Sequence, residues 1–355
     1  MCDLETTNTY HCLSISFAPS NQAKIADQWS RFRAARMDVR GVRPSDVVEL
    51  QSQSSDLPSR CPFFLEPPEN LQISSHAAYT IVNTEPLVDF ATPTLNRVIH
   101  VGGLGAREPK QVVEKFNDIL NLRDKTVIIS FGTIVTASTL KEDVKSSIVE
   151  TVARFPNVTF IWKYEKQDDA FAKKASEVAP NLHLVKWIPQ NDLLADPRVA
   201  AFITHAEMGS IQELAIRGKP GLFIPILGDQ PRNAGMMERA GLGRVFDKRD
   251  LSNSNKFADA VADLLENEIY YANARRIAAM IAKKPFSARE QLIRTVEFAA
   301  EFGPSPALRP QSHDMNWIAY HNIDIIALFV VLTLSLIVLV VKYFIESKTR
   351  KRRPS

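Results

Sequence analysis

Cysteine is scarce in this sequence, with only Cys2, Cys12 and Cys61 among 355 residues. Three thiols cannot all pair with one another, and their separations do not match the close pairs that hold zinc. The sequence therefore favours neither a disulfide framework nor a zinc site. We expect the protein to bind no metal and no resident cofactor.

An excess of charge of either sign is also lacking. The sequence has 43 Lys and Arg against 40 Asp and Glu, a formal net charge of +3, and much of the excess lies at the extreme C-terminus. This balance gives no case for a nucleic-acid partner, and we expect none. With 45% hydrophobic and 23% charged residues, the composition excludes a disordered or fibrous chain, and the length leaves room for two domains.

The N-terminal region has no apolar run of signal-peptide length. Residues 1–41 contain none, and Asp3 and Glu5 stand where a basic flank would precede such a run. Nothing in this part of the sequence directs secretion. Residues 44–70 are rich in Ser and Pro and are typical of a loop.

What the sequence does contain is a regular alternation of short apolar runs and helical segments. Strands are predicted at 126–131, 158–163, 182–185, 200–204, 221–224 and 243–246, and helices at 141–154, 210–217, 233–240, 257–282 and 288–302. A linker with a short helix is expected over 106–124. This alternation predicts an α/β fold with a parallel, doubly wound sheet.

The stretch from Trp187 to Gln230 carries polar side chains at the ends of predicted strands. His205 directly follows the strand at 200–204. Ser210 and Glu213 stand at capping-box spacing, which predicts that a helix opens at Ser210. Because the carboxyl ends of parallel strands share one edge, we expect these side chains on the edge where open α/β sheets bind ligands.

The chemistry of this edge favours an anion beside a ring. Free backbone amides and the dipole of a helix opening at Ser210 suit a phosphate, and His205 could add a donor. Glu213 could hold the vicinal hydroxyls of a ribose, and Trp187 offers a flat face to a base. Hydroxyls of a second sugar could be read by the next residues along the edge, Asp229 and Gln230. The pattern predicts a site for a nucleotide-diphosphate sugar.

Taken singly, each of these residues has an ordinary structural explanation. Trp187 alone would be core, His205 a satisfied polar group, and Ser210 with Glu213 a helix cap. Their joint spacing favours the functional interpretation.

The stretch resembles the signature of the UDP-glycosyltransferase family, in particular its animal UDP-glucuronosyltransferase branch. The family residues match here at Trp187, Gln190, His205, Ser210, Glu213, Asp229 and Gln230. The resemblance implies that the tryptophan stacks on uracil, the glutamine and glutamate hold the nucleoside, and the histidine and serine contact the diphosphate. It also implies that the final Asp-Gln pair reads the donor sugar, and that Thr133 replaces the serine of a turn near the phosphates.

The same resemblance implies a fold of the GT-B type. The expected domains are an acceptor-binding remnant over 1–105, a complete Rossmann-like, UDP-sugar-binding domain over 106–320, a transmembrane helix over 323–345 and a basic tail over 346–355. Residues 79–105 resemble the family's strand, crossover and glycine-rich entry to the second domain.

One position departs from the family pattern. The family has glycine two residues after the histidine, and this chain has Glu207 there. A carboxylate beside a diphosphate is repulsive, and a residue other than glycine has fewer backbone conformations. We expect the donor site to be present and weakened.

The catalytic base is not expected in this chain. The family uses a histidine base with an aspartate partner, and a base must lie within hydrogen-bond reach of the proton that it removes. Both residues lie upstream of the segment that residues from 14 onward resemble, so the resemblance implies an N-terminally truncated member. His11 and His76 are candidates by residue type alone.

The leading functional hypothesis is a UDP-glycosyltransferase that transfers a sugar, with inversion, to a small lipophilic acceptor. UDP-glucuronate is the expected donor, with UDP-glucose left open. The alternative is a catalytically dead fragment that binds the donor and modulates full-length relatives, and an oligomer with itself or with relatives is left open. A third alternative is a different two-domain sugar-nucleotide enzyme without a membrane span.

The only long apolar run is at the C-terminal end. Residues 325–341 contain only Thr333 and Ser335 as polar residues. At about 1.5 Å per residue this run nearly crosses a ~30 Å hydrocarbon layer, and residues up to 345 lengthen it. A buried core helix is the alternative, but the run is apolar on every face. The basic tail after it predicts a cytosolic C-terminus and a single-pass protein of the endoplasmic reticulum. Without a signal peptide, a late anchor could instead insert after translation, which would leave the globular domain in the cytosol.

Overall fold

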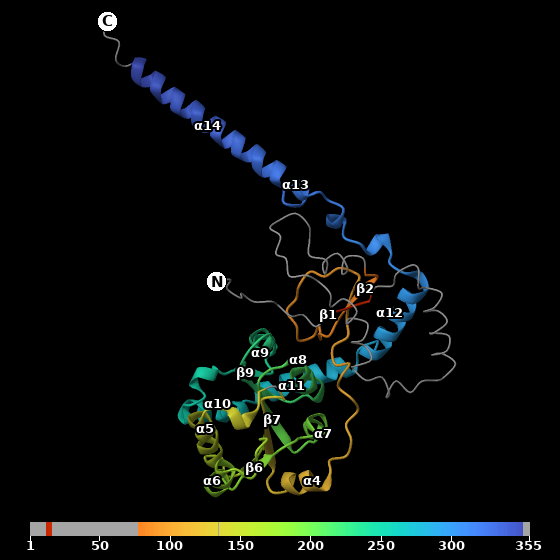
Figure 1. The fold of residues 1–355 in the computed structure, drawn as a ribbon, viewed down its shortest axis with the longest axis vertical. Coiled ribbons are helices and arrows are strands. Elements are labelled where there is room, and N and C mark those ends of the chain that lie inside the picture. The colour runs from red at the N-terminus through yellow and green to blue at the C-terminus, as the bar shows by residue number, and fades with distance from the viewer. Residues whose placement is uncertain (1–11, 16–76, 134, 351–355) are drawn as a thin grey trace, which may run out of the picture.

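The computed structural model describes residues 12–15, 77–133 and 135–350 of the chain (Figure 1). The loop predicted at 44–70 and the two histidine candidates, His11 and His76, lie outside the described residues.

The described chain is organised around a six-stranded parallel sheet. Its strands follow the order β6-β5-β4-β7-β8-β9, and every neighbouring pair is parallel. The bounds are β4 Lys125–Ser130, β5 Val158–Lys163, β6 Leu182–Val185, β7 Val199–Thr204, β8 Gly221–Phe223 and β9 Gly243–Val245. The prediction of a parallel sheet is confirmed. The inner strands β5, β4, β7 and β8 are largely buried, as expected for strands covered on both faces, whereas the edge strands β6 and β9 are partly exposed.

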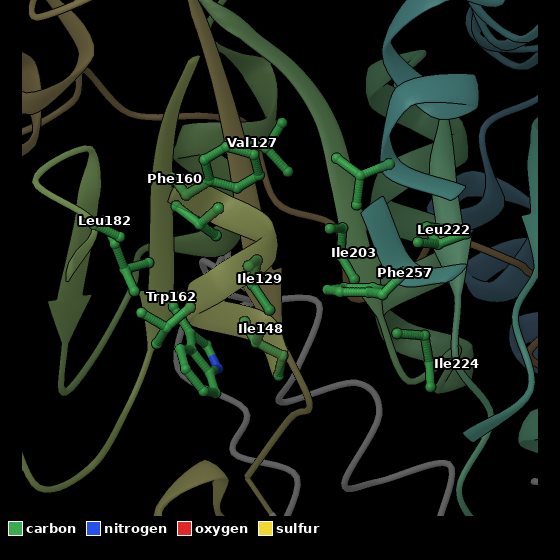
Figure 2. Close-up of a cluster of buried hydrophobic side chains, with 14 of the residues drawn as sticks. Val127, Ile129, Ile148, Phe160, Trp162, Leu182, Ile203, Leu222, Ile224 and Phe257 are labelled. Carbon is green, nitrogen blue, oxygen red and sulfur yellow. The ribbon is translucent and has the colours of Figure 1, made fainter. Parts of the chain in front are cut away.

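One face of the sheet is covered by α5 (Glu142–Ala153), α6 (Ala170–Val178) and α10 (Ser254–Glu266). Figure 2 shows the side chains of this layer, which form one buried hydrophobic cluster that includes Val127, Ile129, Phe160, Trp162, Ile203 and Phe257. Helix α6 was not predicted from the sequence. Its only buried side chains are Ala172 and Ala175, and alanine produces a weak hydrophobic periodicity.

The opposite face is covered by α4 (Glu114–Leu120), α7 (Gln190–Ala195), α8 (Met208–Arg217), α9 (Gln230–Arg239) and α11 (Glu268–Ala282). The intervening strand residues, such as Ile128, Ile161 and Phe202, point to this side. This is the period-two alternation of a strand buried on both faces. Burial of each such side chain stabilises the fold by about 1.5–3 kcal/mol relative to leaving it exposed. The two layers therefore hold the sheet edges in fixed positions.

Helix α8 does not begin where the capping-box spacing predicts. It begins at Met208 with Glu207 as the preceding cap residue, so the predicted start at Ser210 is wrong by two residues. Ser210 lies inside the first turn, where its hydroxyl is free to accept a bond from another element. The helix ends as predicted, at Gly218, whose φ of 65° is the left-handed conformation that glycine favours.

A smaller sheet lies beside the main domain. It consists of β1 (Cys12–Ile15), β2 (Tyr79–Val82) and β3 (Val98–His100), with β1 antiparallel and β3 parallel to β2. Helix α12 (Ala288–Phe302) leaves the main domain and packs against β2 (Figure 1), where Tyr79 and Phe298 meet edge to face with ring centroids 6.3 Å apart.

Polar contacts attach this smaller part to the main domain. The Gln212 side chain of α8 donates to the Asn83 carbonyl at 2.8 Å and accepts from the Gly103 amide at 3.0 Å. Lys284 pairs with the buried carboxylate of Glu85 at 2.9 Å. These bonds fix the path of the chain into residues 105–107, which border the site.

The C-terminal helix α14 (Ile323–Arg350) follows the short helix α13 (Trp317–Tyr320) and extends away from the rest of the molecule (Figure 1). Its segment Ile323–Ile345 has a mean hydropathy of 3.0 and is not buried against the protein. The alternative of a core helix is therefore wrong. By length and composition, the segment is suited to cross a membrane. The described short 3-10 helices are Ala137–Thr139, Lys248–Asp250, Pro306–Leu308 and Gln311–His313.

Candidate functional site

A polar cleft of about 360 Å³ opens at the carboxyl edge of the main sheet. Its walls come from the turn after β4, the end of β5, the segment between β6 and α7, the start of α8 and the linker near Gly105. Five of the residues that the sequence predicts for the site line it, namely Thr133, Trp187, Gln190, Ser210 and Glu213. The parallel topology brings them together because each follows a strand of the same sheet.

Gln190 connects two of the predicted residues. From the first turn of α7, its side-chain amide donates to the Glu213 carboxylate at 2.7 Å and to the Ser210 hydroxyl at 3.2 Å. Both partners lie on α8, so this amide joins the two helices at the cleft. The remaining oxygens of Glu213 and Ser210 stay within reach of hydroxyl or amide groups of a ligand.

The Glu213 carboxyl of the cleft has a shifted pKa. Burial raises its pKa above the ordinary value, although the bond from Gln190 and the cations Arg217 and Arg107 act in the opposite direction. A partly buried carboxyl in a cleft with a shifted pKa is a frequent mark of a functional group.

This shift predicts how stability depends on pH. Because the folded state holds the Glu213 proton more tightly than the unfolded chain, the contribution of Glu213 to the free energy of unfolding falls as pH rises from its ordinary pKa to the raised one. We expect Glu213→Gln to be more stable than the wild type at about pH 7 and equal to it at about pH 4. Urea denaturation at both pH values measures this. A difference that does not change with pH, or one matched by the exposed Glu150→Gln, would contradict it.

Trp187 stands at the rim of the cleft. Its side chain is 67% exposed, so the indole is a free flat surface and not part of the core. The Lys163 ammonium lies 5.8 Å from the centre of its ring, a distance at which a cation is attracted to an aromatic face. Trp187 is therefore partly oriented before any ligand enters.

Lys163 is a cleft residue that sequence reasoning missed. It ends β5, is only 7% exposed, and donates to the carbonyl of Gly132. The available signal was a cation at the carboxyl end of an otherwise apolar strand. Lysine is rarely buried among core side chains, so a lysine at the end of a buried strand indicates a role at the sheet edge.

The turn after β4 packs closely on His205. Gly132 has a φ of 84°, and a side-chain carbon built there would lie 2.6 Å from His205 Nε2. Glycine is required at this position both by its backbone conformation and by the lack of space. The adjacent Thr133 is exposed and lines the cleft.

His205 is buried behind the surface of the cleft. It is 2% exposed, and its Nε2 lies 3.1 Å from a carboxylate oxygen of Glu207, which does line the cleft. Between them, Ala206 holds a φ of 66°, a conformation that is uncommon for a residue with a side chain. The structure thus places Glu207, and not His205, at the surface that a ligand would meet.

Asp229 and Gln230 do not line this cleft in the described structure. The Gln230 amide oxygen accepts from the backbone of Ile226 and Leu227 at 2.8 and 3.0 Å. The Asp229 carboxylate accepts from Asn233 at 2.8 Å. Both side chains stabilise the start of α9, which explains their position apart from the other predicted residues.

A larger cavity of about 710 Å³ lies between the linker and α7. It is lined by Pro109, Asp192 and Arg198, among others, and Arg198 directly precedes β7. It therefore opens on the amino side of the sheet, away from the strand ends that carry the predicted residues.

Sequence comparison decides the family. The profile of the family described as "UDP-glucoronosyl and UDP-glucosyl transferase" matches residues 59–352 of this chain. The chain belongs to this family. Among its relatives, ugt-47 of Caenorhabditis elegans is 35% identical over 246 residues, which cover 68% of this chain and 46% of the relative.

A mammalian relative is similar over a stretch of comparable length. UDP-glucuronosyltransferase 1A7 of Rattus norvegicus is 29% identical over 262 residues, which cover 74% of this chain and 48% of that protein. The chain spans about half the length of the relatives that it matches. The resemblance to the animal UDP-glucuronosyltransferase branch is confirmed.

A solved structure supports the fold. The structure of LpCGTa in complex with UDP is similar with a TM-score of 0.50 and 22% sequence identity, covering 65% of this chain and 56% of that one. Together with the parallel sheet and the family assignment, this likeness confirms the GT-B type of fold.

Proposed function

We propose that the cleft binds the uridine diphosphate part of a UDP-sugar. The observation that carries this proposal is the Gln190 amide, which holds Ser210 and Glu213 on one wall while Trp187 stands exposed at the rim. A flat ring, a carboxylate and a hydroxyl are thus presented to one space of about 360 Å³. A nucleotide needs these three kinds of group for its base, its ribose and its phosphate.

Each residue has a role in this proposal. Trp187 stacks on uracil, and Glu213 with Gln190 holds the ribose hydroxyls. Ser210, Thr133 and the amides that open α8 hold the diphosphate, with His205 behind them, because helix N-termini attract anions. Asp229 and Gln230 remain our prediction for the sugar, and they reach it only if their present hydrogen bonds rearrange.

We infer that the reaction served by this donor is hexosyl transfer with inversion to a small lipophilic acceptor, with UDP-glucuronate as the donor. Family membership and the UDP-bound structural neighbour support this proposal. We assign the donor to residues 106–320 and the acceptor side to residues 1–105.

The test is an activity assay of the purified chain in detergent with UDP-glucuronate and a phenolic acceptor. Glucuronide formed by the wild type and lost in His205→Ala supports transfer. Saturable donor binding without any product supports the second candidate, a donor-binding protein that acts on relatives. The hydrogen bond between His205 and Glu207 favours this candidate, because it engages the histidine that we expect to contact the diphosphate. Product formation that His205→Ala leaves unchanged would contradict the assignment of this cleft.

We also propose that residues 323–345 anchor the protein in the endoplasmic reticulum membrane with the basic tail, residues 346–355, in the cytosol. An exposed apolar helix and a basic flank support this proposal. Protease protection of microsomes tests it. A protected globular part agrees with the proposal, and a fully digested one contradicts it.

We expect Lys163→Met to weaken UDP binding about tenfold, because the variant loses a buried cation beside the cleft and the contact that orients Trp187. Methionine keeps the length of the apolar stem, so the fold is preserved. Calorimetric titration with UDP measures the effect. Lys166→Met, which removes an exposed lysine three residues further on, is the control, and an equal loss in both variants would rule out a specific role of Lys163.

A further inference from the structure

We propose that the Glu207 carboxylate competes with the phosphate groups of the donor for His205 and thereby sets the affinity of the cleft for its donor. The inference rests on the proposed function, because it assumes that a uridine diphosphate enters this cleft. It adds a specific role for a residue that belongs to this chain.

The Nε2 atom of His205 is already hydrogen-bonded to Glu207. This atom lies 3.1 Å from Glu207 Oε2, and the buried Nδ1 of the same ring has no hydrogen-bond partner in the described part of the chain. An ionised carboxylate only accepts hydrogen bonds, so the bond to Glu207 requires Nε2 to be the donor. The donor that His205 could offer to a phosphate is therefore already engaged.

His205 and Glu207 differ in how far they are exposed to the cleft. His205 is 2% exposed, whereas the side chain of Glu207 is 50% exposed and lines the cleft. On the side of β4, Gly132 packs closely against the imidazole, since a carbon added there would lie 2.6 Å from Nε2 and 3.4 Å from Glu207 Oε2. A phosphate that approaches Nε2 from the cleft therefore competes with this carboxylate for the same nitrogen.

The charges around the cleft also place Glu207 in competition with a phosphate. Glu207 directly precedes α8, where the helix dipole favours a negative group. The carboxylate thus occupies the same field that would attract a phosphate. The lining of the cleft contains two cations, Arg107 and Lys163, and two carboxylates, Glu207 and Glu213. Loss of the Glu207 charge leaves a net positive lining.

The experiment compares Glu207→Gln with the wild type by calorimetric titration of the full chain in detergent. The ligands are UDP and uridine, which shares the base and ribose but has no phosphate. We expect Glu207→Gln to bind UDP roughly tenfold to a hundredfold more tightly, because a half-exposed carboxylate next to a diphosphate is only partly screened. We expect the affinity for uridine to change less than about twofold.

Two further variants serve as controls. Glu207→Gly removes the charge together with the side chain, so it gives a second measurement if the amide disturbs the turn. Glu177→Gln removes the same charge from an exposed position on α6 and is expected to leave both affinities unchanged.

The outcomes separate the two proposals. A selective gain in UDP affinity in both Glu207 variants supports the inference. Uridine binding without that gain overturns the role of Glu207 and leaves the donor cleft standing. A chain that binds neither ligand in any variant overturns both the proposed function and the inference.

Discussion

Replacement of Trp187 by alanine is expected to lower the affinity for UDP roughly tenfold to a hundredfold. Stacking of a base on an aromatic side chain contributes about 1–3 kcal/mol to binding, and this contribution is lost when the ring is removed. The indole is 67% exposed, so its loss creates no cavity and leaves the stability of the fold nearly unchanged. Titration with UDP and thermal denaturation measure the two quantities separately.

The matched control for this change is Trp187→Phe. A phenyl ring retains a flat face and is expected to recover most of the lost affinity. Trp187→Ala that binds UDP as the wild type does would show that uracil does not stack here. Equal losses in both variants would indicate that the indole acts through its contact with Lys163 and not through stacking.

Replacement of Gly132 by alanine is expected to damage both the fold and the site. A residue with a side chain is strained at a φ of 84°, which costs about 1–3 kcal/mol. The added carbon would also lie 2.6 Å from the ring of a buried histidine. We therefore expect the free energy of unfolding to fall by at least about 2 kcal/mol and UDP binding to be lost.

Gly209→Ala is the control for this second prediction. Gly209 lies in the first turn of α8, has no positive φ, and an added carbon there meets no atom within 4 Å. Alanine at a helical position is expected to stabilise the fold by about 0.5–1 kcal/mol. Urea denaturation of both variants is the measurement, and a Gly132→Ala protein as stable as the wild type would contradict the packing of this turn against His205.

Sequence reasoning predicted the parallel sheet well because its signals were strong. The inner strands β4, β5, β7 and β8 are short, mostly apolar runs that are largely buried, and such runs are recognised without knowledge of tertiary contacts. The cleft wall followed from the same pattern, since residues placed after successive parallel strands must meet at one edge. Gln190, Ser210 and Glu213 meet there with hydrogen bonds of 2.7 and 3.2 Å.

The remaining details depend on contacts that a linear pattern does not encode. Spacing alone made Ser210 a helix cap, whereas the structure begins α8 at Met208 and gives the Ser210 hydroxyl to Gln190. The sequence raised Glu207 as a problem for the diphosphate but did not show that its carboxylate binds His205. Lys163 was overlooked because a single lysine at a strand end looks like a solvated residue until its burial is known.

Calorimetric titration of UDP into the detergent-solubilised chain shows whether the edge of the main sheet binds uridine diphosphate. We expect saturable binding at one site per chain, with a dissociation constant between about 1 μM and about 1 mM and a clear loss in Trp187→Ala. A folded protein that gives no saturable heat with UDP up to several times about 1 mM would contradict it.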